Sequence, residues 1–141
     1  MKDTELLQYV HETAEMGIVG LQDVEWQIED QRLREAVQSQ IKEYQNISQR
    51  SGDLLRSKGQ EPKKPGVMAR ISSEIMSDIQ AITDSSSSKI AEMVIKGNNM
   101  GVTKGLKHLH DYAGGDRQVR GLAESLLATE EANIEQMKPF L

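Results

Sequence analysis

The sequence predicts an all-α domain in which four long helices form an antiparallel bundle and a shorter helix lies in the middle connection. Apolar residues recur at steps of three and four, which is the period of an amphipathic helix, and no run alternates with the period of a strand. Prolines, the strongest helix breakers, occur only at positions 62, 65 and 139. The length of 141 residues suits one domain with its own core, residues 1–141.

The first two helices are expected over residues 4–28 and 32–58. Asp3 or Thr4 can cap the first helix, and the polar break between the two is short enough to make them an antiparallel hairpin. The second helix should end before Gly59, which opens a loop rich in glycine and proline. The inward stripe of the first helix is Leu7, Val10, Ala14, Ile18, Leu21, Val24 and Ile28. The stripe of the second is Leu33, Val37, Ile41, Tyr44, Ile47, Ser51, Leu54 and Leu55.

The second half repeats this organisation after a long connection. A shorter helix is expected over 67–83, and the third and fourth long helices over 86–113 and 117–138, with Asp116 capping the last. The stripe of the third long helix is Ile90, Val94, Gly97, Gly101, Gly105, Leu109 and Tyr112. The stripe of the fourth is Val119, Leu122, Ala123, Leu126, Leu127, Ile134 and Met137. The chain is therefore expected to form two helical hairpins joined by a crossover that contains a helix.

Three stretches resemble ferritin-like bundles of bacteria, in particular a family described only as a domain of unknown function. They are residues 15–21 in the first helix, 66–71 at the start of the crossover helix, and 93–99 in the third long helix. The resemblance covers nearly the whole chain and implies a ferritin-like antiparallel four-helix bundle. Such bundles hold two metals at mid-height with a glutamate from each of two helices and a Glu-x-x-His from each of the other two.

Two segments have the Glu-x-x spacing with asparagine in the place of histidine. On the last helix Glu130 and Asn133 fall within the apolar stripe, whereas Glu43 and Asn46 fall outside the stripe of the second helix. On the second helix, Tyr44 is the residue of this segment that is expected to point inward. Further inward or edge positions that bear on a site are Asn98 and His108 on the third long helix and His11 and Glu15 on the first.

These residues support three readings of the middle of the bundle. The favoured one is a buried polar layer of Tyr44, Asn98, Glu130 and Asn133, in which Glu130 accepts hydrogen bonds from Tyr44 and an asparagine. The weaker one is a reduced iron or manganese site that uses Glu15, Glu130 and His11. Metal binding is doubtful because iron sites need several anionic oxygens and imidazole, and asparagine supplies a neutral carbonyl. A third possibility is that Glu130 faces a binding partner.

The functional expectation is a cytoplasmic, non-enzymatic protein without a cofactor that acts through its surface or a partner. Cysteine is absent, the first residues are polar, and no apolar run reaches the roughly 20 residues of a membrane span. No motif of a hydrolase or nucleotide enzyme occurs. The net charge of −5 disfavours nucleic acid, although one basic stretch lies at residues 56–70.

Two further surfaces are singled out by their apolar or small residues. Tyr9, Met16 and Val19 lie away from the main stripe of the first helix, so either a homodimer or the crossover helix should cover them. Glycines at 97, 101 and 105 form a ladder on one face of the third long helix, which predicts a close helix approach or a pocket beside it.

Overall fold

The computed structural model describes residues 1–63 and 86–141, and every regular element within them is helical. The elements are α1 (Asp3–Glu25), α2 (Gln31–Ser57), α4 (Ser87–Asp111), α5 (Arg117–Met137) and a final 3₁₀ turn, η2 (Lys138–Phe140). The four expected long helices are thus confirmed, each to within three residues at either end. The helix expected over 67–83 lies outside the described residues.

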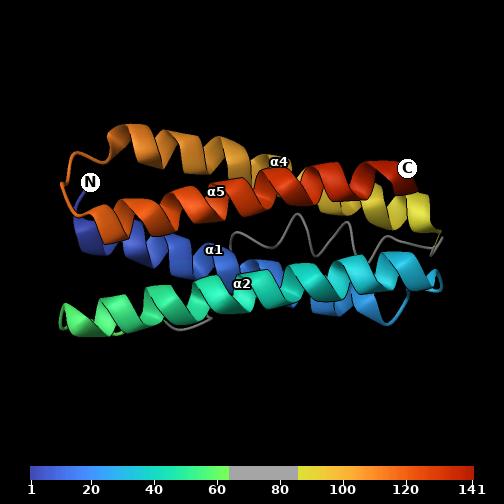
Figure 1. The fold of residues 1–141 in the computed structure, drawn as a ribbon, viewed down its shortest axis with the longest axis horizontal. Helices are drawn as coiled ribbons and strands as arrows, with labels where there is room; N and C mark the ends of the chain where they lie inside the picture. Colours follow the sequence, from blue (N-terminus) through green and yellow to red (C-terminus); the bar gives the residue numbers. More distant parts are fainter. Residues whose placement is uncertain (64–85) are drawn as a thin grey trace.

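The four helices lie side by side, and the direction of each follows from its connection to the preceding helix (Figure 1). α1 and α5 run away from the end that holds the N-terminus, whereas α2 and α4 run toward it. The short connections make α1 and α2 one hairpin and α4 and α5 another. α2 ends at one end of the molecule, and α4 begins at the opposite end (Figure 1).

Polar side chains fix the helix starts. Asp30 accepts hydrogen bonds from the backbone N–H groups at the start of α2, and Asp116 does the same for α5. The expectation that Asp3 or Thr4 caps α1 is wrong, because the helix already includes both residues and the capping position is Lys2, which forms no side-chain cap. Asp3 instead accepts a hydrogen bond of 2.5 Å from the Tyr112 hydroxyl and so ties the start of α1 to the end of α4.

The core is built from the predicted stripes. Residues such as Leu7, Val37, Val94 and Leu126 are buried between the helices. α1 packs mainly on α2 and α5, and α4 packs mainly on α5, so that α1 and α4 meet only sparsely. Ile28 remains in the core although α1 ends at Glu25, three residues earlier than expected. The sparse meeting of α1 and α4 is what leaves room for a cavity.

Candidate ligand cavity between α1 and α4

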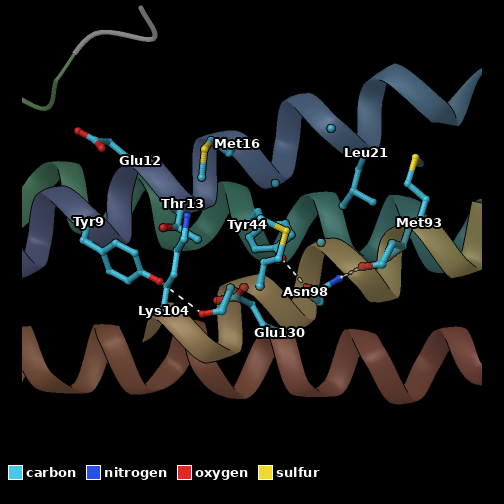
Figure 2. Close-up of a pocket in the computed structure, with 16 residues that line it drawn as sticks. Tyr9, Glu12, Thr13, Met16, Leu21, Tyr44, Met93, Asn98, Lys104 and Glu130 are labelled. Carbon is cyan, nitrogen blue, oxygen red and sulfur yellow. Dashed lines mark hydrogen bonds between the residues drawn. The ribbon is translucent and has the colours of Figure 1, made fainter. Parts of the chain in front are cut away.

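A cavity of about 130 Å³ lies between α1 and α4, near the middle of both helices (Figure 2). Its wall is mainly apolar, and glycines of both helices open it, among them Gly20 on α1 and Gly97 and Gly101 on α4. Two glycines of the predicted ladder therefore border a pocket, which is one of the two expected outcomes. A Cβ atom at position 105 would lie 3.7 Å from the Tyr9 hydroxyl and 3.8 Å from Leu127. Other side chains of the wall are Tyr9, Glu12, Thr13, Met16, Leu21, Tyr44, Met93, Val94, Asn98, Met100, Lys104 and Glu130.

Three of the four residues of the predicted polar layer are joined by hydrogen bonds. The Tyr44 hydroxyl donates to Asn98 Oδ1 at 2.9 Å, and Asn98 Nδ2 donates to the Val94 carbonyl at 2.8 Å. Asn133 Nδ2 lies 3.4 Å from the Tyr44 hydroxyl and 3.3 Å from Asn98 Oδ1. This cluster connects α2, α4 and α5, and all three side chains are buried.

Glu130 is buried, with 2% of its surface exposed, but the role expected for it is wrong. Its Oε1 has no hydrogen-bond partner, and Tyr44 and Asn133 bond to Asn98 instead. The reason is the position along the helix axis, since Glu130 lies beside Gly101, almost one turn of α4 away from Asn98, where Tyr44 and Asn133 meet. In Figure 2 the Glu130 carboxyl lies between Tyr9 and Asn98, along the cavity.

Two glycines let large side chains reach the cavity. A Cβ atom at position 101 would overlap the Glu130 carboxyl, so glycine at this position is what admits the side chain. A Cβ atom at position 17 would lie 2.6 Å from the Tyr44 ring, so Gly17 lets that ring pack against the backbone of α1. The sequence placed Gly101 on the inward face of its helix but did not show which side chain fills the space.

The cavity environment favours the neutral forms of Glu130, Tyr9 and Tyr44. Burial raises the pKa of Glu130 to about 8, since few groups around the carboxyl replace the water that it loses. Burial, helped by the nearby Glu130, raises the pKa of Tyr9 to about 12 and also raises the pKa of Tyr44. Near neutral pH the carboxyl is therefore mainly protonated and the phenols keep their protons.

Glu130 is not brought together with the other two candidate metal ligands, Glu15 and His11. Glu15 accepts a 2.8 Å hydrogen bond from the Ser48 hydroxyl on α2, and His11 Nε2 lies 3.7 Å from Glu15 Oε1. Neither borders the cavity that holds Glu130. Among the residues that the structure describes, no three His, Asp or Glu side chains gather closely enough to hold a metal ion. Glu43 and Asn46 point outward, as predicted.

Tyr9 has a role that the sequence pattern did not indicate. Its ring lies 4.1 Å from that of His108, centroid to centroid, and its hydroxyl donates to the Gly101 carbonyl at 3.4 Å. Met16, expected on the same outer face of α1, borders the cavity, and only Val19 is exposed, at 43%. Met93 and Met100 of α4 also border it.

The basic side chains of residues 56–63 each face a carboxylate. Arg56 lies 3.4 Å from both Asp53 and Glu61, and the Lys58 ammonium lies 2.8 Å from Asp116. Lys63 Nζ lies 4.0 Å from Glu12 Oε1. Lys64 and Arg70 lie outside the described residues. The described part of this basic stretch therefore offers little uncompensated charge to a phosphate.

Comparison with other proteins adds no assignment. No helix in the described parts of the chain has the length and apolarity needed to cross a bilayer. No family model, curated protein or solved structure matches the chain.

Proposed function

We propose that this chain is a ferritin-like four-helix bundle that acts by non-covalent binding and not by metal-dependent oxidation. The observation that carries the proposal is that the buried Glu130 carboxyl belongs to no group of three His, Asp or Glu side chains that could hold a metal ion among the described residues. Such a site cannot offset the cost of dehydrating a di-iron centre. It can recognise a small molecule, because the cavity beside it is apolar and presents an unpartnered polar group.

The ferritin-like part of the proposal is supported by helix direction. Two hairpins whose inner helices α2 and α4 run the same way require one long crossover, and this is the connectivity of ferritin-like bundles. The resemblance at residues 15–21 and 93–99 supports the same fold. A cytoplasmic location and weak pairing of two chains through α1 belong to the proposal as well.

The alternative is a reduced iron or manganese site, and metal analysis separates the two functions. The protein is expressed in medium supplemented with both metals, desalted and analysed for metal per chain, beside Glu130→Gln and Glu15→Gln. We expect no stoichiometric metal in any of the three proteins, because Glu15 is engaged by Ser48 away from Glu130. One or more metals per chain in the wild type, lost in both variants, would establish the metal site and overturn the proposal.

A further inference from the structure

We propose that the cavity between α1 and α4 binds a small organic ammonium ion, with its charged nitrogen against Glu130 and its apolar body between the two helices. This inference rests on the proposed binding function and adds the chemical class of the ligand. It starts from two independent observations, a mainly apolar cavity and a carboxyl within it that is 2% exposed and has an unpartnered Oε1.

The hydrogen-bonding capacity of the wall favours a ligand that donates. The Tyr44 hydroxyl donates to Asn98 and accepts from Asn133, and the Asn98 amide uses both its oxygen and its nitrogen. The Tyr9 hydroxyl donates to a backbone carbonyl of α4. The carboxyl of Glu130 remains, with its unpartnered Oε1. It is mainly protonated near neutral pH, but a cation beside it favours its ionised form, which is purely an acceptor. An ammonium group, which has donors and no acceptor, complements it.

The apolar wall also suits a cation. The rings of Tyr9 and Tyr44 border the cavity, and an aromatic face attracts a cation through its quadrupole. The thioethers of Met16, Met93 and Met100 supply polarisable, adaptable contacts for the rest of the ligand. Between mainly apolar walls, a charge-assisted hydrogen bond is stronger than the same bond at the surface.

The charged and titratable groups around Glu130 agree with this assignment. They are Tyr9 and Glu12 on α1, Tyr44 on α2 and Lys104 on α4. The Glu12 carboxylate lies 4.0 Å from the Lys63 ammonium, and Lys104, a cation of the wall, is exposed and does not lower the pKa of Glu130. An anionic ligand would be repelled by an ionised Glu130, and the ammonium group that the wall contains, that of Lys104, is exposed.

The volume limits the ligand to roughly the size of one ring. A cavity of about 130 Å³ is slightly smaller than engineered cavities of roughly 150 Å³ that accept benzene. Because this cavity is partly open, one or two further atoms can extend toward its edge. Benzylamine is therefore a suitable probe, and benzyl alcohol is its neutral counterpart of the same shape.

The test compares the affinities of these two probes for the wild type, Glu130→Gln and the outer-face control Glu43→Gln, by calorimetry or NMR titration. We expect the wild type and the control to bind benzylamine about tenfold tighter than benzyl alcohol, because only the amine pairs with the carboxylate. In Glu130→Gln, which keeps the shape of the side chain, this preference should disappear.

A second variant keeps the test independent of how Glu130→Gln folds. Gly20 borders the cavity, and a Cβ atom added at this position would have no neighbour within 4 Å. The leucine of Gly20→Leu should therefore fill part of the cavity and weaken the binding of both probes. Equal or tighter binding of benzyl alcohol to the wild type, or a preference for benzylamine that survives Glu130→Gln, overturns the inference. So does a failure of both probes at millimolar concentration, which would mean that water alone fills the cavity. These failures differ from failure of the proposed function, which would be seen as bound metal.

Discussion

At the scale of single residues, Glu130 is the side chain whose environment departs most from an ordinary one. A glutamate without a hydrogen-bond partner at Oε1 and with 2% of its surface exposed destabilises the fold whenever it is ionised. The fold tolerates it because the carboxyl holds its proton near neutral pH, at a pKa of about 8. The same property that makes Glu130 costly makes it available to a ligand.

A pH dependence of stability follows from this raised pKa. Between about pH 4.5 and about pH 8 the folded chain holds a proton on Glu130 that the unfolded chain releases, so the free energy of unfolding should fall as the pH rises. The shift from 4.5 to about 8 sets an upper limit of about 5 kcal/mol on this loss, and water in the cavity lowers it. Below and above this window the contribution of Glu130 is constant.

Urea denaturation at about pH 5 and about pH 8 measures the effect. Glu130→Gln cannot ionise, so it should lose most of the decline and be more stable than the wild type at the higher pH. Glu43→Gln, on the outer face of α2, should keep the decline of the wild type. An unchanged decline in Glu130→Gln would assign the pH dependence to other groups.

At the scale of helices, the apolar periodicity predicted which side chains point inward, but not which of them form hydrogen bonds with one another. The inward positions of Tyr44, Asn98, Glu130 and Asn133 follow from about 100° per residue and are confirmed by their burial. Which of them bond to one another depends on the axial offset of α4 against α5 and on side-chain rotamers, and a single sequence encodes neither. Because this offset is not encoded in the sequence, the sequence-based expectation that Glu130 bonds to Tyr44 was wrong.

The close approach of the Glu130 side chain to α4 gives a prediction at this scale. In Gly101→Ala the new methyl group would overlap the carboxyl, so we expect a destabilisation of about 1–3 kcal/mol. In a Glu130→Ala background the clash is gone, and the same change should stabilise by up to about 1 kcal/mol through helix propensity. Gly121→Ala, in α5 with no neighbour within 4 Å, is the matched control and should stabilise in both backgrounds.

Chemical denaturation of the four proteins of this cycle gives the coupling between positions 101 and 130. A coupling near zero would show that the carboxyl moves aside at no cost, and Glu130 would then not be held at the cavity. The glycine ladder indicated a pocket or a close approach beside the third long helix, but not that one of its members admits a carboxyl.

At the scale of the whole molecule, the lengths of the connections predicted how the helices pair. The short breaks before α2 and α5 predicted two hairpins, and the helix directions in Figure 1 confirm them. The sparse meeting of α1 and α4 could not be predicted, because it depends on how the two hairpins are set against each other. That spacing creates the cavity, and it also changes what is expected of the outer face of α1.

The outer face of α1 determines whether two chains can associate through this helix. Of the three residues expected at an interface, Tyr9 packs on His108 and Met16 borders the cavity, which leaves Val19 as the exposed one. A stable dimer buries roughly 800 Å² on each partner, far more than one valine and its neighbours provide. We therefore expect a monomer at low micromolar concentration and partial pairing only at several hundred micromolar.

Sedimentation velocity over this concentration range measures the association, and two variants locate it. Val19→Glu places a charge on the exposed face without touching the cavity wall, so it should abolish the weak pairing and leave the free energy of unfolding within about 0.5 kcal/mol of the wild type. Met16→Glu places a charge in the apolar wall, so it should cost about 1–3 kcal/mol of stability whether or not chains pair. A tight dimer at low micromolar concentration, unaffected by Val19→Glu, would contradict the expectation and show that another face forms the interface.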